Sequence, residues 1–586
     1  MKKKIQSRIT NKVVYQKAQS LGMTHLQSTI LANRCNDSNW SEHLLHTRLN
    51  HIPAPSLLKN NELAVKRILL AIKNKQKIGI LTDYDVDGIT SHAIIFYALT
   101  EFFNFDKDLI SSHIGHRINQ GYGISQSLTD GIIQLDNKPD IIITADCGSS
   151  DEQRIKQLKE ANIDVIVTDH HAVPESGIPK SAYTTVNPNQ KACEYPDKTI
   201  AGCMVAWLLM SQLRAELISH QLIVNETPKL SVLLDFVSLG TVADAVSLLS
   251  LANRAVVLAG LQVMNSKTRF AWQALSLLLK KEQFDVDDLG FQIGPRINAR
   301  SRMADPFMAL EFLTAENLTD AKNSLNKLDQ NNIERRKTEK KMLLTAHDLA
   351  DQSLDNNQRQ SLVIYDQEFH AGVQGIVASR LVDYFGLPSI VLSQTLDGKI
   401  LTGSARTVEK INIHGVLKNI SQRYPDLLLS FGGHKGAAGL KIKLDDFERF
   451  SKVFDQTVVE MLNKEQLEPI VLVDDSLGDD DFNTKTLSLL NELKPYGRTF
   501  ENPVFCNEFI VQFYQQVGQK GEHIRFVLIY NQKLIRAIWF SAIKDNEFVP
   551  FIEGNTINAA YYLMADNYNG NENIQLNIQY AELVSA

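Results

Sequence analysis

The sequence lacks the features that mark secreted, disulfide-stabilised or membrane-spanning proteins. Its five cysteines are scattered, odd in number and never arranged as CxxC, so they predict neither a zinc site nor a disulfide framework. The basic N-terminus is not followed by the apolar segment of a secretory signal. No apolar run is long enough to span a bilayer. These absences favour a reduced, cytoplasmic location.

An excess of positive charge is missing as well. The formal net charge is −6, whereas a surface that binds nucleic acid usually needs basic residues to neutralise phosphates. The net charge is only weak evidence against nucleic-acid binding, because a metal site can gather carboxylates in one place while a basic groove lies elsewhere. The sequence also contains no Walker loop and no serine–histidine–acid order, which disfavours nucleotide kinases and serine hydrolases.

What the sequence does contain is a regular alternation of short apolar strands and helical segments. Strands are expected at residues 78–81, 141–146 and 165–169, with a helix over 61–73 before the first and one over 151–161 between the second and third. This alternation predicts an α/β fold with a doubly wound parallel sheet. Each expected strand ends in acidic residues or histidine.

A length of 586 residues predicts three or four domains, and the residue pattern changes several times along the chain. Residues 317–352 contain neither proline nor glycine and predict a long connecting helix. A second α/β pattern follows, and alternating short strands beyond it predict a small β-barrel. The expected boundaries are 1–60 for an N-terminal extension, 61–310 for the first α/β domain, 311–352 for the connecting helix, 353–464 for the second α/β domain and 465–586 for the barrel.

Three carboxylates follow the first expected strand at alternate positions: Asp83, Asp85 and Asp87. Their mutual repulsion favours a bound cation, and oxygen ligands at this density suit Mg²⁺ or Mn²⁺. Gly88 would let the following helix begin close to such a site. The alternative interpretation is an acidic turn that caps a helix N-terminus.

Further polar residues follow other apolar segments, namely Asp146, the pair His170–His171, and Asp244. The carboxyl ends of parallel strands meet at one crevice, so we expect these side chains to converge there. One histidine can bind a metal while Asp169 fixes its orientation, and the other can face substrate. Helix capping and hydrogen-bonded loop histidines are the alternatives for each motif alone. Together they favour two divalent ions, which activate water and stabilise charge at phosphorus.

These motifs resemble, in order, the four motifs of the DHH-family phosphoesterases: 83–88, 145–148, 169–171 and 240–244. Residues 432–435 with Gly439 are similar to the GGHK-type motif of the DHH-associated domain. Within the family the RecJ branch is most similar, on the segments 117–123, 186–188, 294–298 and 375–380. The resemblance runs from about Leu57 to Leu440, and the C-terminal region suits the RecJ oligonucleotide-binding (OB) barrel.

The resemblance implies a role for each matching residue. The implied metal ligands are Asp85, Asp87, Asp146, His170 and Asp244, with Asp83 as a further ligand. His171 would contact the scissile phosphate or assist the leaving oxygen. The residues implied to hold the DNA backbone and its 5′ end are Arg117, Asn298, Arg302, Ser379, Arg380, Gly432, Gly433 and His434.

Some of these DNA contacts have alternative readings or altered surroundings. A helix-surface ion pair is the alternative for Arg380, whereas the glycine pair would let backbone amides approach phosphate closely. The sequence departs from the RecJ pattern in two places. Arg300 and Ser301 replace a small Ala-Gly pair, and Phe369 stands where tryptophan is common.

The implied function is hydrolysis of single-stranded DNA from its 5′ end to 5′-mononucleotides, with two Mn²⁺ or Mg²⁺ ions, in DNA repair and recombination. The two α/β cores would clasp a flexible strand, and the barrel would bind the incoming part by stacking and backbone contacts. Implied partners are single-strand-binding protein and a RecQ-type helicase, with a monomeric enzyme. The alternatives are a DHH phosphodiesterase for short oligonucleotides or cyclic dinucleotides, and a catalytically inactive DNA-binding scaffold.

Overall fold

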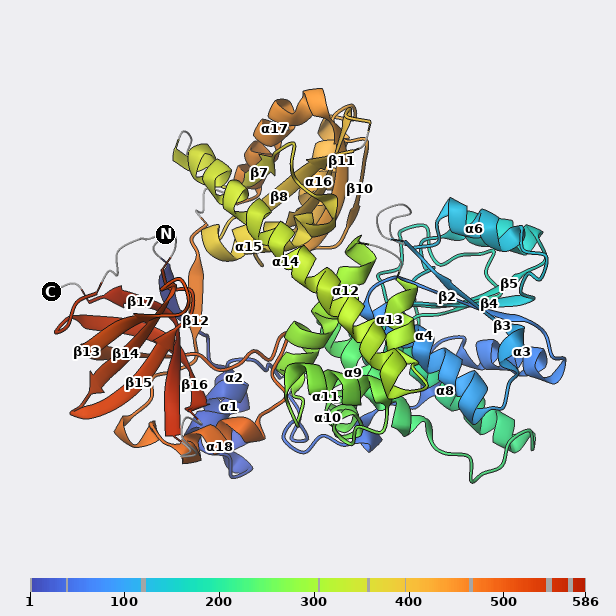
Figure 1. Cartoon of the computed structure of the whole chain (residues 1–586), viewed down its shortest axis with the longest axis horizontal. Helices are drawn as coiled ribbons and strands as arrows, with labels where there is room; N and C mark the ends of the chain where they lie inside the picture. Colours follow the sequence, from blue (N-terminus) through green and yellow to red (C-terminus); the bar gives the residue numbers. More distant parts are fainter. Residues whose placement is uncertain are drawn as a thin grey trace. The chain divides into compact units, whose positions relative to one another are not determined.

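The structure, a computed structural model, divides into two compact units (Figure 1). Unit 1 comprises Met1–Leu45, Lys337–Lys494 and Glu501–Ala586, and unit 2 comprises His46–Arg336 and Pro495–Phe500. The residues that the structure describes are 3–37, 40–116, 123–303, 306–355, 359–395, 397–462, 467–543, 551–566 and 573–584. Over these residues, no helix combines the length and apolar character needed to cross a bilayer.

Unit 2 is built on a parallel five-stranded sheet with the order β3-β2-β4-β5-β6. Every residue of β2 and β4 is buried, as expected for strands covered by helices on both faces. This confirms the predicted parallel α/β sheet. The strands are β2 (Ile78–Thr82), β3 (Ile110–Ile114), β4 (Ile141–Ala145), β5 (Asp164–Thr168) and β6 (Thr184–Val186).

Helix α4 is the central helix of unit 2, because all residues from Val86 to Ile95 are buried. It packs against both α8 and α9. The helices of this unit are α3 (Asn61–Lys73), α4 (Val86–Tyr97), α6 (Gln126–Ile133), α7 (Glu152–Glu160), α8 (Gly202–Ser219), α9 (Leu234–Ala243), α10 (Leu251–Asn265), α11 (Phe270–Leu279), α12 (Gly294–Met303) and α13 (Phe307–Leu313). The long helix α14 (Leu318–Asp355) contains the boundary between the two units.

Unit 1 contains a second, mixed sheet with the order β10-β11-β9-β8-β7. Strands β7 and β8 run parallel and the other neighbours run antiparallel, with apolar clusters packed on both faces. Its elements are β7 (Leu362–Tyr365), α15 (Gln374–Phe385), β8 (Ser389–Gln394), β9 (Ile400–Arg406), α16 (Ile413–Arg423), β10 (Ser430–Gly433), β11 (Ala437–Lys443) and α17 (Phe447–Met461).

The predicted C-terminal barrel is confirmed as a closed five-stranded barrel in the order β13-β14-β15-β17-β16, drawn in red in Figure 1. Its interior holds aromatic rings that include Phe505, Phe509, Phe526 and Tyr561. The strands are β13 (Phe505–Val517), β14 (His523–Tyr530), β15 (Lys533–Trp539), β16 (Thr556–Asp566) and β17 (Asn573–Leu583).

The N-terminal segment of unit 1 is tied to the chain that leads into the barrel. Strand β1 (Lys4–Ser7) pairs in parallel with β12 (Ile470–Val473). The segment continues as α1 (Lys12–Ser20) and α2 (His25–Ala32), and α18 (Thr484–Glu492) lies farther along the chain.

A buried ion pair reinforces this connection. The Arg34 guanidinium donates to both carboxylate oxygens of Asp474, at 2.5 and 2.9 Å, and both side chains are fully buried. The Val504 backbone N–H donates to the same carboxylate at 3.0 Å. Asp474 therefore joins the N-terminal helices to the first barrel strand.

Replacing Asp474 with alanine should lower the free energy of unfolding of this part of unit 1 by about 3–5 kcal/mol, because Arg34 stays buried without its charge partner. Urea denaturation followed by circular dichroism measures the change. The matched control is Asp37→Ala, which removes an exposed ion pair with Lys17 and should leave the midpoint unchanged. Equal midpoints for Asp474→Ala and the parent protein would contradict the prediction.

Candidate metal centre

The candidate site lies at the carboxyl ends of three neighbouring strands, β2, β4 and β5. Asp83 follows β2 and Asp146 follows β4, and from β2 the chain turns first to β3 on one side and then to β4 on the other. Ligands in open α/β sheets bind outside the strand ends at such a reversal. Asp85 caps α4, since its Oδ1 accepts the backbone N–H groups of Asp87 and Gly88 at 3.0 and 3.2 Å.

The structure brings together all seven side chains predicted for the catalytic set. His170 Nε2 lies 3.2 Å from Asp146 Oδ1, 3.6 Å from Asp244 Oδ2 and 3.7 Å from Asp87 Oδ2. Three groups have ligand atoms that all lie within 4.8 Å of one another. They are Asp83–Asp85–Asp146, Asp87–His170–Asp244 and Asp146–His170–His171. Asp146 therefore belongs to two adjacent groups.

The chemistry of this cluster fits divalent cations. Burial raises the pKa of Asp146 well above its usual value, and the charges of Asp87 and Asp85 raise it further. Burial and the same two charges also raise the pKa of Asp244. Among the residues that the structure describes, His170 Nε2 is buried without a hydrogen bond. Carboxylate oxygens and one imidazole nitrogen are a donor set that Mg²⁺ and Mn²⁺ accept.

Asp87 is held in place by the start of α8. The backbone N–H groups of Gly202 and Cys203 donate to its two oxygens at 2.6 and 2.9 Å. These N–H groups have no carbonyl partner within the helix, and the helix dipole favours an anion there. A Cβ at position 202 would lie 2.8 Å from Asp146 Cβ, and one at Gly240 would lie 2.8 Å from Asp87 Oδ1. Only glycine fits at these two positions.

Asp146 itself has an unusual backbone conformation. Its φ is +60°, in the left-handed region that residues other than glycine rarely adopt. Such strain gathers at functional sites because the surrounding structure must hold it. The neighbouring Cys147 is buried and burial raises the pKa of its thiol, as expected for a packed rather than a reactive cysteine.

Asp169 orients the histidine pair, but its ring contact is with His171 rather than with the proposed metal ligand His170. Its Oδ1 lies 2.8 Å from His171 Nδ1, whereas its contact with His170 is to the backbone N–H, at 2.7 Å. Burial lowers the pKa of His171, whereas the hydrogen bond and charge of Asp169, with Asp244 and Asp85 nearby, raise it to about 9. The Asp169 carboxylate therefore favours the protonated form of His171.

The predicted DNA contacts of unit 2 are only partly visible. Arg117 lies outside the described residues, as does the side chain of Arg302, whose backbone belongs to α12. Asn298 Oδ1 accepts the backbone N–H of Val86 at 3.2 Å, so Asn298 lies at the start of α4 beside the carboxylates. Arg300 donates to Asn331 Oδ1 at 3.0 Å.

The predicted contacts of unit 1 gather on α15 and on the β10–β11 turn. Residues 432–434 are exposed, and the His434 backbone N–H donates to the Ala437 carbonyl at 2.8 Å. The Ser379 hydroxyl donates to the carbonyl of Gly375 at 3.0 Å within the helix. Arg380 Nε lies 3.9 Å from Glu339 Oε1, and the arginine side chain is mostly exposed. Phe369 is buried in an apolar cluster of this domain.

Sequence reasoning overlooked Arg406, at the end of β9. A Cβ at Gly375 would lie 2.8 Å from Arg406 Nη2, so the guanidinium lies against the first turn of α15. Arg406 also pairs with Ala437 of the strand that follows the exposed turn. A cation beside a helix N-terminus attracts anions. The only sequence signal was a basic residue at the end of an alternating strand.

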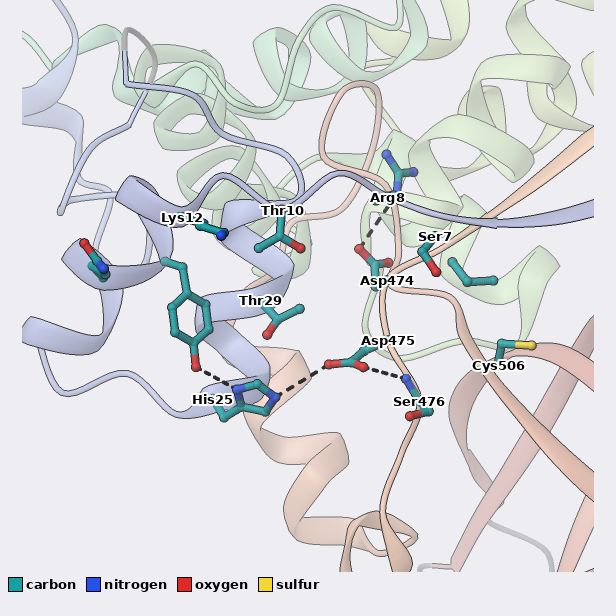
Figure 2. Close-up of a pocket in the computed structure, with 13 residues that line it drawn as sticks. Ser7, Arg8, Thr10, Lys12, His25, Thr29, Asp474, Asp475, Ser476 and Cys506 are labelled. Carbon is teal, nitrogen blue, oxygen red and sulfur yellow. Dashed lines mark hydrogen bonds and ion pairs between the residues drawn. The ribbon is translucent and has the colours of Figure 1, made fainter.

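A pocket of about 750 Å³ lies within unit 1, lined by the N-terminal segment and residues 473–476 (Figure 2). Two of its basic side chains lie beside acidic ones. Arg8 Nε lies 3.8 Å from Asp474 Oδ1, and His25 Nε2 lies 3.6 Å from Asp475 Oδ2 (Figure 2). The pocket therefore does not concentrate one sign of charge as the carboxylate cluster does.

Fold and site together define a DHH-type protein that carries an oligonucleotide-binding barrel. The DHH family N-terminal domain matches residues 77–241, the DHHA1 domain 358–460 and the RecJ OB domain 473–580. The single-stranded-DNA-specific exonuclease RecJ of Haemophilus influenzae is 34% identical over 536 residues, which cover 90% of this chain and 91% of that protein. The chain belongs to the RecJ family, which confirms the resemblance seen in the motifs.

Solved structures support the same fold. The crystal structure of RecJ from Thermus thermophilus in complex with Mn²⁺ has a TM-score of 0.79 at 23% identity, covering 100% of this chain and 80% of that one. The complex of the same protein with Mg²⁺ has a TM-score of 0.74 at 23% identity, covering 100% and 78%. At this identity the likeness describes the arrangement of the backbone.

The carboxylate cluster predicts a stability signature. Mn²⁺ at a hundred times its dissociation constant should stabilise the folded protein by about 2.7 kcal/mol, seen as a higher Tm in calorimetry. Asp146→Asn should lose this shift, yet raise the Tm of the metal-free protein, because it removes a repelled charge and asparagine tolerates a positive φ.

The matched control is Asp235→Asn. The Asp235 carboxylate is also buried in unit 2, but it accepts hydrogen bonds from Arg269 and Trp272 at 2.7 and 2.8 Å. This variant should have a lower Tm and an unchanged Mn²⁺ shift. A full Mn²⁺ shift in Asp146→Asn would rule out Asp146 as a ligand.

Proposed function

We propose that this protein is a metal-dependent exonuclease that hydrolyses single-stranded DNA from the 5′ end, releases 5′-mononucleotides and acts in DNA repair and recombination. Membership of the RecJ family supports the substrate. The observation that carries the chemistry is the convergence of two ligand groups without a common member, Asp83–Asp85–Asp146 and Asp87–His170–Asp244. We propose a catalytic domain over 61–310, a connecting helix over 311–352, a substrate-binding domain over 353–464 and an OB domain over 465–586.

We propose that Asp83, Asp85 and Asp146 hold one divalent ion and that Asp87, His170 and Asp244 hold the other. Two such ions, Mn²⁺ or Mg²⁺, activate a water molecule and stabilise charge on the phosphate oxygens when bound. The surrounding protein holds the ligand side chains in fixed positions. The N–H groups of α8 fix Asp87, and the strand end fixes Asp146 in its left-handed conformation.

His171 is the proposed proton donor on the substrate side. Asp169 binds His171 Nδ1 and fixes the ring, which leaves Nε2 to face a phosphate oxygen. The Asp169 carboxylate, which raises the pKa of His171, favours a proton on the ring. An imidazolium N–H in this position donates to an anionic oxygen and can protonate the leaving 3′ oxygen.

In unit 1, the first turn of α15, Arg406 and the exposed turn at 432–434 form the proposed phosphate-binding surface. Gly432 and Gly433 are exposed at the end of β10, and Arg406 supplies a positive charge beside the helix N-terminus. Arg380 adds a second, mostly exposed guanidinium on the same helix. By resemblance, single-strand-binding protein and a RecQ-type helicase are the proposed partners of a monomeric cytoplasmic enzyme.

End-labelled DNA tests the proposal. Label at the 5′ end of single-stranded DNA should be released first, with Mn²⁺ or Mg²⁺ and not with EDTA, while duplex DNA and short RNA stay largely intact. Asp146→Ala and His170→Ala should reduce release to the level seen with EDTA, because each removes a proposed ligand of one of the two ions. His220→Ala, which changes an exposed histidine of the same unit, should keep the parent rate.

Two outcomes would argue against the assignment. Preferred cleavage of short RNA or cyclic dinucleotides would point to a small-substrate phosphodiesterase. Tight binding of single-stranded DNA without release from any end, in any metal, would point to an inactive scaffold.

The barrel has an outward face suited to single strands. Phe513 is 45% exposed and pairs across β13 and β14 with Val527, which in turn pairs with Arg536 of β15. Arg525 is exposed two residues before Val527, on the same face of β14. An aromatic ring can stack a base, and arginines on the neighbouring strands can neutralise the phosphates.

Phe513→Ala should therefore weaken binding of single-stranded DNA by about 1–3 kcal/mol. Arg525→Gln should reduce the salt dependence of binding by about one unit in the log–log slope. Fluorescence anisotropy in the Asp146→Ala background measures both without cleavage. Leu135→Ala, another half-exposed apolar residue but in unit 2, is the control and should bind like the parent.

A further inference from the structure

The backbone of the His170–His171 pair is held at every polar group. Both backbone N–H groups donate to Asp169 Oδ1, at 2.7 and 3.1 Å. The carbonyl of His171 accepts from Asn187 Nδ2 at 2.9 Å, and the carbonyl of His170 accepts from Asn189 Nδ2 at 2.6 Å. Two donors and two acceptors are thus satisfied by three side chains.

The two asparagines belong to a closed network. Asn187 is fully buried, and its Nδ2 also donates to the Ser149 hydroxyl at 2.9 Å. The Ser149 backbone N–H donates to Asp169 Oδ2 at 3.0 Å, which returns the network to the residue that holds the histidines. Asn187 Oδ1 accepts the backbone N–H of Asn189 at 2.8 Å, so the two asparagines are also linked to each other.

The orientation of the Asn187 amide is determined by these partners. Nδ2 faces two oxygen atoms, the His171 carbonyl and the Ser149 hydroxyl, and Oδ1 faces a backbone N–H. A flipped amide would place Oδ1 against the His171 carbonyl, acceptor against acceptor, and Nδ2 against the Asn189 N–H, donor against donor. An aspartate of the same shape could keep the bond to Asn189 but could not donate to His171.

These contacts fix the backbone of His170, whose ring lies among the carboxylates. His170 Nε2 lies between three carboxylates at 3.2 to 3.7 Å, so a small shift of its backbone changes all three distances. Outer residues that orient metal ligands commonly change metal affinity or activity by about 10–100-fold when removed. Both asparagines contact the histidines through Nδ2 and the backbone carbonyls.

We propose that Asn187 and Asn189 are positioning residues that set the affinity of the site for its divalent ions by clasping the backbone of His170 and His171. This inference rests on the proposed function, because it takes His170 as a metal ligand. It assigns the loop after β6 a role in metal binding although that loop supplies no ligand. Asn187 acts through the His171 carbonyl, and Asn189 acts through the carbonyl of His170 itself.

The test is calorimetric titration of Mn²⁺ into the full chain and its variants. Asn187→Ala, Asn187→Asp and Asn189→Ala should each bind Mn²⁺ at least about tenfold more weakly than the parent. Activity on single-stranded DNA should recover in these three variants as Mn²⁺ is raised, with KM for DNA unchanged. Asn189→Ala keeps the experiment informative if the buried Asn187 variants fail to fold.

Asn265→Ala is the matched control. The Asn265 side chain also bridges two backbone groups of unit 2, the N–H and the carbonyl of Phe284, at 2.7 and 2.9 Å. It should lower the Tm without changing Mn²⁺ affinity. Mn²⁺ affinities within twofold of the parent in all folded asparagine variants, or an equal loss in Asn265→Ala, would overturn the inference.

His170→Ala separates this inference from the proposed function. If His170→Ala loses Mn²⁺ binding while the asparagine variants keep it, only the clasp is wrong. If His170→Ala itself keeps parent affinity, the assignment of His170 as a ligand is wrong and the clasp falls with it.

Discussion

The repulsion among buried carboxylates is the constraint on which the rest of unit 2 depends. Asp83, Asp87 and Asp146 are each no more than 5% exposed, and Asp85 and Asp244 lie beside them. In a poorly hydrated crevice this charge is costly unless cations or oriented dipoles neutralise it. The start of α8 supplies two N–H groups to Asp87, and the donor set invites divalent ions for the remainder.

The free-energy cost of burying these carboxylates is confined to one small region of the fold. Asp83 and Asp146 follow adjacent strands, and Asp87 lies in the first turn of a helix that is otherwise packed on all sides. The apolar contacts of α4 with α8 and α9 keep that turn in place. Glycines at 202 and 240 then let the elements approach closely enough for the ligands to meet.

The histidine pair is likewise held by residues that are not proposed metal ligands. Asp169 carries no proposed metal, yet it organises both histidines through one oxygen, and the loop after β6 completes the arrangement from the other side. The β5–β6 register places Val186 beside Thr168, so this loop starts next to the histidine pair. Membership of the RecJ family and the presence of the OB barrel both favour the proposed polymer substrate.

The sequence by itself determined the parallel α/β sheet, the barrel and the seven residues that converge, because strand periodicity and short acidic and histidine motifs are local patterns, although Asp244 follows helix α9 rather than a strand. It could not reveal that Gly202 and Cys203 bind Asp87 from 115 and 116 residues away, that Asp169 binds the ring of His171, or that Asn187 and Asn189 hold the histidine backbone. Arg406 was missed for the same reason. These contacts depend on which elements become neighbours, and only the tertiary packing decides that.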